Sequence, residues 1–189
     1  MRVAFRAHRV ALLVALLAGC LAATAQALEP QSLEGRVVGV GDGDTVTVLD
    51  AGKVQHRVRL AGIDAPERGQ PGGLRSKESL SAIVFDQPVR VQWHKRDPFG
   101  RLVGTLWVAP RDADCRGRPE CPATLDAGLE QLELGRAWWF RRYAVEQPPD
   151  ERERYESAEA RARERRLGLW RDGGAVPPWE WRQRNRSRP

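Results

Sequence analysis

Apolar and polar residues alternate in short runs over the first half of the chain, and this alternation predicts two β-hairpins and a later short strand. A Gly-Asp turn lies inside a run of valines and threonines at 33–49. The first hairpin then turns at residues 50–53, and the second turns at an Asp-Pro-Phe-Gly sequence. The predicted strands lie within residues 33–49, 54–60, 89–93, 101–108 and 136–140.

Apolar residues at helical spacing predict helices over residues 74–85, 125–134 and 150–167. Gly135 follows the second of these, at the position where many helices end. The third alternates glutamate with arginine and is therefore expected to be mostly solvated. Residues 177–181 are expected to leave the body of the protein as an irregular tail. Strands first and helices mainly afterwards are typical of an α+β fold with a small closed sheet.

The N-terminal segment, residues 1–27, has the features of a secretory signal peptide. It carries three arginines, then an apolar run at 10–17, then a small-residue site that ends at Ala27. The apolar run is shorter than the roughly 20 residues that a membrane-spanning helix needs. We therefore expect an exported protein, periplasmic or secreted, that begins at Leu28. The alternative is a lipobox that ends at Cys20, whose cysteine would be acylated and anchored in a membrane.

Removal of the signal segment leaves Cys115 and Cys121. An even number of cysteines in an exported protein favours a disulfide. The alternative, two free buried thiols, fits poorly with the polar sequence between them, which contains glycine and proline.

Composition changes this interpretation little. The length of 189 residues fits one domain with appendages. The formal charge of +6 includes three arginines of the signal segment, which leaves 28 basic and 25 acidic residues, or about +3. This charge alone does not indicate nucleic acid. The basic cluster from Arg182 onward could touch phosphates or stay solvated, and we favour the solvated interpretation.

The stretch from Gly39 to Glu67 carries the candidate chemistry. Asp44 and Asp64 are separated by a hairpin and could meet on a hard cation such as Ca²⁺, which takes oxygen ligands. Glu67 could then act as a base, and Arg59 could hold a phosphate bidentately. A metal ion, a base and a phosphate clamp together describe phosphodiester hydrolysis.

Three motifs of the chain resemble the staphylococcal-type thermonuclease family. They are Asp42-Gly43-Asp44-Thr45, the run from Arg59 to Glu67 (RLAGIDAPE), and Phe99-Gly100-Arg101. The resemblance covers about residues 35–170. It implies a five-stranded OB-type barrel with about three α-helices, a nuclease domain at 33–172 and a Pro-, Trp- and Arg-rich tail at 173–189. The polar loop at 109–124 departs from the family pattern.

The resemblance also implies roles for individual residues. Asp44, Asp64 and the main-chain carbonyl of Ala65 would hold Ca²⁺, and Glu67 would activate or orient the attacking water. Arg59 and Arg101 would bind the phosphate. The family often has threonine where Ala65 stands, so a hydroxyl is lost here while the carbonyl is kept. The same resemblance implies that Tyr143 makes a weak contact with the substrate, because the family has tyrosines near the bound nucleotide.

Simpler interpretations exist for several of these residues. Asp42 and Asp44 could be turn formers, and Glu67 could pair with Arg59 or Arg101 in a plain salt bridge. An EF-hand is excluded because its acidic positions and its glycine are missing. His56 and His94 have no nearby cysteine or histidine for a zinc site. Most of the seven tryptophans are expected to pack in the core rather than stack on bases.

The sequence therefore predicts an exported Ca²⁺-dependent endonuclease that cleaves DNA and RNA with little sequence preference. The family resemblance further implies 3′-phosphate products. We expect a monomer that favours single strands, has no stable protein partner, and touches no membrane unless Cys20 is lipidated. Two alternatives are a non-catalytic nucleic-acid-binding barrel and a secreted scaffold anchored through Cys20.

Overall fold

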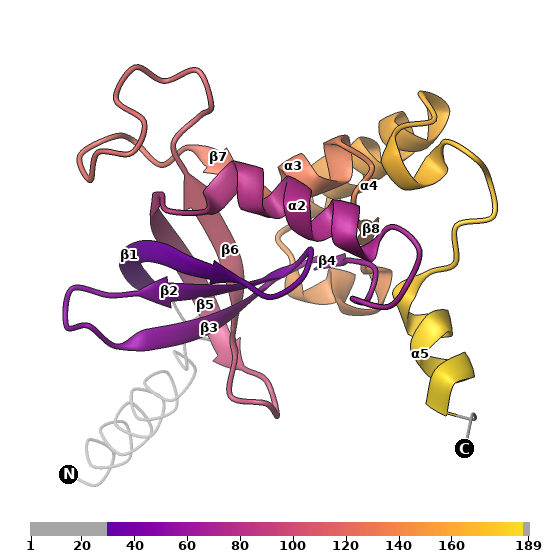
Figure 1. Ribbon diagram of the computed structural model, residues 1–189, viewed down its shortest axis with the longest axis horizontal. Helices are drawn as coiled ribbons and strands as arrows, with labels where there is room; N and C mark the ends of the chain where they lie inside the picture. The colour runs from indigo at the N-terminus through magenta and orange to yellow at the C-terminus, as the bar shows by residue number, and fades with distance from the viewer. Residues whose placement is uncertain (1–29, 187–189) are drawn as a thin grey trace, which may run out of the picture.

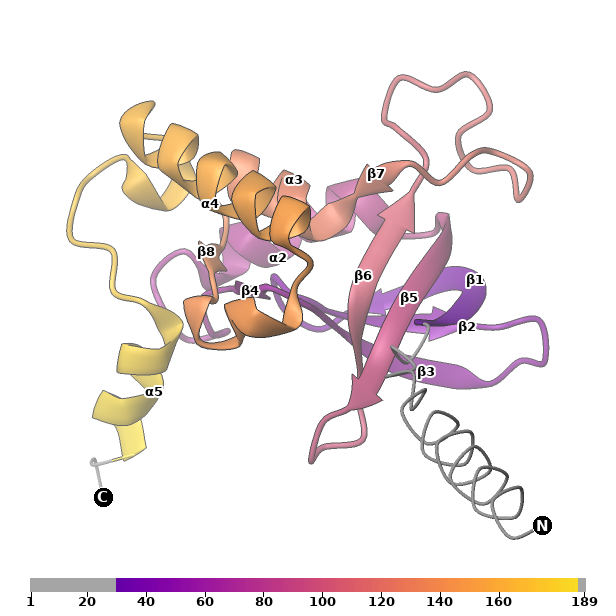
Figure 2. The ribbon, with the colours of Figure 1, turned by 180° about the vertical axis from the view of Figure 1, so that it is seen from behind.

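Five strands form a closed barrel in the computed structural model, which describes residues 30–186 (Figures 1 and 2). The strand order is β3-β2-β1-β5-β6, and a parallel pairing between β3 and β6 closes the barrel. The other barrel pairings are antiparallel. The barrel strands are β1 (Gln31–Val40), β2 (Thr45–Leu49), β3 (Gln55–Leu60), β5 (Pro88–Arg96) and β6 (Leu102–Val108). The predicted OB-type α+β fold is confirmed.

Short polar turns fix the first hairpins. Between β1 and β2, the Asp44 N–H donates to Asp42 Oδ1 at 3.1 Å, as expected for an aspartate that closes a turn. Between β2 and β3, Asp50 Oδ1 accepts the Val54 N–H at 2.9 Å, and Lys53 has a φ of 59°. Both turns lie where the sequence predicts them.

The helices gather at one end of the barrel (Figures 1 and 2). A two-stranded pair, β4 (Ile63–Asp64) and β8 (Trp138–Trp139), lies among them. The α-helices are α2 (Gly73–Val84), α3 (Ala127–Glu133), α4 (Pro149–Glu164) and α5 (Pro178–Arg186). Two 3₁₀ helices, η1 (Arg141–Glu146) and η2 (Gly168–Trp170), lie before and after α4.

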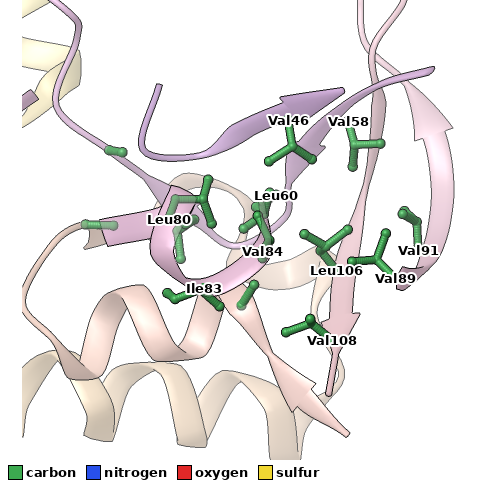
Figure 3. Close-up of a cluster of buried hydrophobic side chains, with 14 of the residues drawn as sticks. Val46, Val58, Leu60, Leu80, Ile83, Val84, Val89, Val91, Leu106 and Val108 are labelled. Carbon is green, nitrogen blue, oxygen red and sulfur yellow. The ribbon is translucent and has the colours of Figure 1, made fainter. Parts of the chain in front are cut away.

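The hydrophobic core lies where α2 covers the barrel interior (Figure 3). Strand residues that point inward meet one face of α2, because side chains alternate in a strand and recur every three or four residues in a helix. The contributing residues are fully or almost fully buried: Val46, Val58, Leu60, Val91 and Leu106 from the barrel, and Leu80, Ile83 and Val84 from α2. This core makes the barrel a rigid support for the turns at its open edge.

Asp126 joins the last helices to the barrel. Its side chain caps α3 by accepting the N–H groups of Gly128 and Leu129, and it also accepts the Tyr155 hydroxyl of α4 at 2.9 Å. Burial raises the pKa of Asp126 to about 6, although these hydrogen bonds oppose the rise.

Two predicted elements are wrong in part. The helix expected at 125–134 begins only at Ala127, because Leu125 and Asp126 form β7, which pairs with the end of β6. The tail expected to be irregular contains α5, in which Pro178 is buried and occupies the first turn, where proline is tolerated. The ring of Trp179 stacks on Phe140 at a centroid distance of 5.6 Å, which holds this helix on the body.

The polar loop at 109–124 holds the predicted disulfide between Cys115 and Cys121, which is confirmed. The guanidinium of Arg116 donates to the carbonyls of Ala109 and Ile83 and ties this loop to the end of α2. Within residues 30–186, no helix has the length and apolar character needed to cross a membrane. The predicted signal segment, the Leu28 start and Cys20 lie outside the described residues.

Candidate active site

Two turns of the first sheet bring the candidate residues together. Antiparallel pairing of β2 with β3 places Thr45 opposite Arg59, and the Leu60 N–H donates to the Asp44 carbonyl at 2.8 Å. The chain then turns through Gly62, whose φ of 71° favours glycine, and enters β4 with Asp64. Residues 20 positions apart therefore meet at one edge of the barrel.

Asp44 and Asp64 are both buried, with exposed fractions of 5% and 1%. Arg59 bridges them: its Nε lies 3.2 Å from Asp44 Oδ1, and its Nη2 lies 3.0 Å from Asp64 Oδ1. The second oxygen of Asp44 accepts the Ala65 N–H at 2.8 Å. The two carboxylates thus face the same small volume, as predicted, but they share it with the arginine that the sequence assigned to phosphate.

Burial and neighbouring charges both act on the Asp44 carboxyl. Burial raises the pKa of the Asp44 carboxyl to about 7, and the Arg59 guanidinium opposes that rise. Asp64 and Asp42 add like charge and raise it further. A divalent cation would relieve this repulsion, because it favours the ionised form of both aspartates.

The donor set fits Ca²⁺ only if backbone and water oxygens complete it. Among residues 30–186, no three His, Cys, Asp or Glu side chains form a group that could hold a metal. Two carboxylates, the Ala65 carbonyl and water are nevertheless the oxygen ligands that Ca²⁺ takes, with six to eight in total. Asp44, Asp64 and Ala65 are thus the residues that would hold the ion.

Glu67 and Arg101 lie at the rim of the same volume. Arg101 Nε lies 2.6 Å from Asp97 Oδ2, and its Nη1 donates to Thr45 Oγ1 at 3.3 Å. That hydroxyl in turn donates to Asp44 Oδ1 at 3.0 Å, so Arg101 is linked to the buried carboxylates. The Glu67 side chain is about 40% exposed, which leaves it open to solvent and to a ligand.

An open cavity of about 1520 Å³ connects the predicted residues. It exceeds the 300–1,000 Å³ that is usual for small-molecule pockets, so an extended ligand fits it better. Its lining includes Asp44, Arg59, Asp64, Ala65, Glu67, Arg101 and Tyr143, together with other basic and aromatic side chains. All predicted site residues except the disulfide cysteines thus line one cavity.

Tyr143 belongs to η1 and is 42% exposed. The Lys95 ammonium lies 5.0 Å from the centre of its ring, and Lys95 also pairs with Glu146 at 2.6 Å. A half-exposed ring beside a cation is suited to stacking against a base next to a phosphate.

Sequence reasoning missed Arg182. This residue of α5 donates from Nη1 to Glu67 Oε1 at 2.7 Å and to Asp64 Oδ1 at 3.2 Å, and from Nη2 to Asp64 Oδ2 at 2.7 Å. Partial burial lowers the pKa of Arg182, but the hydrogen bonds to Asp64 and Glu67 outweigh it and raise that pKa above its usual value. The solvated interpretation of Arg182 is therefore wrong, and the ion pair of Glu67 is with Arg182.

The histidines have other partners. His56 Nε2 lies 2.8 Å from Asp50 Oδ2 in the β2–β3 hairpin, and His94 lies 3.5 Å from Glu146 at the cavity wall. Trp138 and Trp139 are buried, as expected for core packing.

Comparison with known proteins identifies related chains. The profile of the family described as "Staphylococcal nuclease homologue" matches residues 57–172. The chain is 38% identical over 156 residues to "Protein ParB" of Escherichia coli, covering 82% of each chain. It is 36% identical over 161 residues to "Micrococcal nuclease" of Shigella flexneri, covering 81% of this chain and 82% of the relative. An "Uncharacterized endonuclease" of Escherichia coli is 33% identical over 154 residues, with 80% and 86% covered.

Proposed function

Because the chain belongs to the staphylococcal nuclease family, we propose that it is a Ca²⁺-dependent endonuclease that hydrolyses the phosphodiester bonds of DNA and RNA. One observation carries the proposal: Asp44 and Asp64 are buried side by side in a cavity that also exposes Glu67 and Arg101. The raised pKa of Asp44, a buried acid beside the Arg59 guanidinium in a cavity, is a feature of catalytic sites.

The proposed chemistry divides among five side chains and one main-chain carbonyl. When bound at Asp44, Asp64 and the Ala65 carbonyl, Ca²⁺ would offset negative charge on the substrate phosphate. Glu67 Oε1 or Oε2 would accept the proton of the attacking water or orient that water. Arg59 and Arg101 would donate to the non-bridging oxygens of the phosphate, whose charge grows as the new bond forms.

The finer features of the substrate and products belong to the same proposal. Little sequence preference is supported by a cavity lined by charged and aromatic groups, which can contact backbone phosphates and any base. Cleavage that leaves a 3′-phosphate, and a preference for single strands, rest on the family resemblance.

We also propose that the protein is exported. The Cys115–Cys121 disulfide supports this, because disulfides persist mainly in oxidising compartments. N-terminal sequencing of the protein from an exporting bacterial host should give Leu28. A blocked, membrane-bound chain that starts at Cys20 would contradict cleavage after Ala27.

Cleavage assays with controlled metal test the proposed activity. Single-stranded and duplex DNA and RNA are incubated with Ca²⁺, with Mg²⁺ in its place, and with a Ca²⁺ chelator. We expect cleavage with Ca²⁺, loss with chelator, and product ends that become extendable by a polymerase only after phosphatase treatment. A wild type that binds these strands but cleaves none at any Ca²⁺ concentration would establish the non-catalytic barrel instead.

A further inference from the structure

Helix α5 (Figure 1) lies beyond the part of the chain that the family profile matches, yet Trp179, Arg182 and Arg186 of this helix line the cavity. Two contacts hold its start beside the site. Trp179 stacks on Phe140 with an angle of 16° between the rings, and the Gln70 Nε2 donates to the Val176 carbonyl at 2.6 Å. Gln70 Oε1 also accepts the Glu67 N–H at 3.2 Å. The Glu67 loop and the approach to α5 thus share one buried glutamine.

The two faces of α5 differ in chemistry. Residues three and four positions apart share a helix face, which places Trp179, Arg182 and Arg186 together. All three line the cavity. Glu180 and Arg184 do not line it and pair with each other at 3.1 Å. The helix thus presents a basic and aromatic face to the site, the combination found where proteins bind single-stranded nucleic acid.

Arg182 competes with a cation for Asp64. Its Nη2 lies 2.7 Å from Asp64 Oδ2, while Ca²⁺ would stand 2.3–2.6 Å from a ligand oxygen. Arg59 and Arg182 already share Asp64 Oδ1. Two positive groups on one carboxylate repel each other, and a bound ion would also offset the charge that attracts Arg182. Binding of a cation at Asp64 therefore weakens the attraction between this carboxylate and the guanidinium, which favours release of Arg182.

The released guanidinium stays within the cavity, because the Trp179 and Val176 contacts hold the base of the helix. The anion that would enter the cavity with the metal is the substrate phosphate. A planar guanidinium grips phosphate oxygens bidentately, as it grips a carboxylate.

We propose that Arg182 is a further phosphate-binding residue of this site, which pairs with Asp64 and Glu67 in the free protein and exchanges them for a substrate phosphate when the cation binds. The proposal rests on the nuclease function proposed above. It makes α5 a part of the nucleic-acid interface, with Arg186 and the Trp179–Phe140 stack as its continuation along the cavity.

Two titrations of Arg182→Ala test this exchange, with Arg184→Ala as the matched control on the outer face of the same helix. The first measures Ca²⁺ binding without nucleic acid. The half-saturating Ca²⁺ concentration should fall for Arg182→Ala, because a competitor for Asp64 is gone, and should stay at the wild-type value for Arg184→Ala.

The second titration measures binding of a single-stranded phosphorothioate oligonucleotide at saturating Ca²⁺ over a range of salt. Arg182→Ala should weaken binding about tenfold, since one charge-assisted contact is lost. It should also reduce the slope of log K against log salt by about 1. Arg182→Gln keeps a side chain that can hydrogen-bond but lacks the charge, so it should reduce the salt slope by the same amount as Arg182→Ala. Circular dichroism should show that each variant is folded.

The outcomes separate this proposal from the nuclease function. If the wild type neither binds nor cleaves the strands, both proposals are overturned. If the wild type is active but Arg182→Ala binds the oligonucleotide as tightly as Arg184→Ala, or more tightly, then Arg182 does not bind a substrate phosphate and only occupies the site in the free protein. This proposal alone then fails. An unchanged Ca²⁺ affinity for Arg182→Ala would overturn the exchange as well.

Discussion

Arg59 occupies an unusual position for a residue that is expected to hold a phosphate. Its side chain is only 14% exposed and contacts Asp44, Asp64 and the Leu60 carbonyl. Removal of one charge from a close set of charged groups leaves the others uncompensated. The effects of Arg59 and the two aspartates are therefore expected to be coupled rather than additive.

Asp44→Asn should weaken the protein's response to Ca²⁺. Asparagine keeps an oxygen for the Ala65 N–H but lacks the charge that would hold the ion. We expect the half-saturating Ca²⁺ concentration to rise about tenfold or more, a typical effect of changes at a metal site, with activity partly restored at high Ca²⁺. Calorimetric titration of Ca²⁺ and cleavage rates over a Ca²⁺ series measure this.

The control for Asp44→Asn is Asp42→Asn in the same turn, which removes an equal charge beside the site from a residue that is not among the predicted ligands. Its Oδ1 accepts the Asp44 N–H, which asparagine can still do. Equal shifts of Ca²⁺ affinity in both variants would contradict the assignment of Asp44 as a ligand.

Asp126 should make stability depend on pH. Its pKa is about 6 in the folded protein against 3.8 for the unperturbed group, so between these values the folded state binds more protons. The stabilising contribution of Asp126 to the free energy of unfolding is then fully present below about pH 4, and it is lost as the pH rises through 6. Relative to Asp126→Asn, the wild type should gain on the order of 1–3 kcal/mol as pH falls from 7.5 to 4. Urea unfolding of both proteins at several pH values measures this gain. If their unfolding free energies change with pH in parallel, the prediction is wrong.

At the residue scale, sequence reasoning located side chains better than their partners. Asp44, Arg59, Asp64 and Glu67 belong to one contiguous stretch, and turn and strand spacing alone bring them to one edge. The partner of Glu67 could not be found in this way, because Arg182 is 115 positions away in the sequence. A pairing at that distance depends on the packing of the whole chain.

At the scale of elements, the hairpins were predictable and α5 was not. Alternating side chains and Asp-Gly turns are local signals, and the structure has these strands where they are expected. The sequence of α5 is poor in aliphatic residues, so it lacks the apolar periodicity by which amphipathic helices are detected. Its position depends instead on the Trp179–Phe140 stack, the hydrogen bond from Gln70 to the Val176 carbonyl, and the ion pairs of Arg182.

The disulfide loop is expected to stabilise the protein without serving the site. It lies on the opposite side of the molecule from α5 in both views (Figures 1 and 2), and neither Cys115 nor Cys121 lines the cavity. Closing so short a loop contributes about 2 kcal/mol in the chain-entropy model. The double variant Cys115→Ser and Cys121→Ser should lose about that much stability in urea and keep its cleavage rate. If the double variant is fully folded but cleaves much more slowly than the wild type, the loop contributes to catalysis.

At the scale of the whole molecule, the cavity is assembled from parts that are far apart in the chain. The turn between β1 and β2 supplies Asp44, β4 supplies Asp64, the 3₁₀ helix η1 supplies Tyr143, and α5 supplies Arg182. The family profile accounts for the stretch from residue 57 to 172. The terminal helix α5 and the turn that carries Asp44 lie outside that match.

The most direct test of the account compares Glu67→Gln with wild type in two assays, turnover of a single-stranded oligonucleotide and binding of its phosphorothioate analogue, both at saturating Ca²⁺. Loss of proton acceptance should lower turnover by about 10²–10⁴-fold, while binding stays within about threefold, because Asp44, Asp64 and the arginines remain. Glu120→Gln, in an exposed pair with Arg118, is the control for loss of a plain surface ion pair and should match wild type. Turnover by Glu67→Gln at the wild-type rate would contradict the catalytic role of Glu67 and, with it, the proposed mechanism.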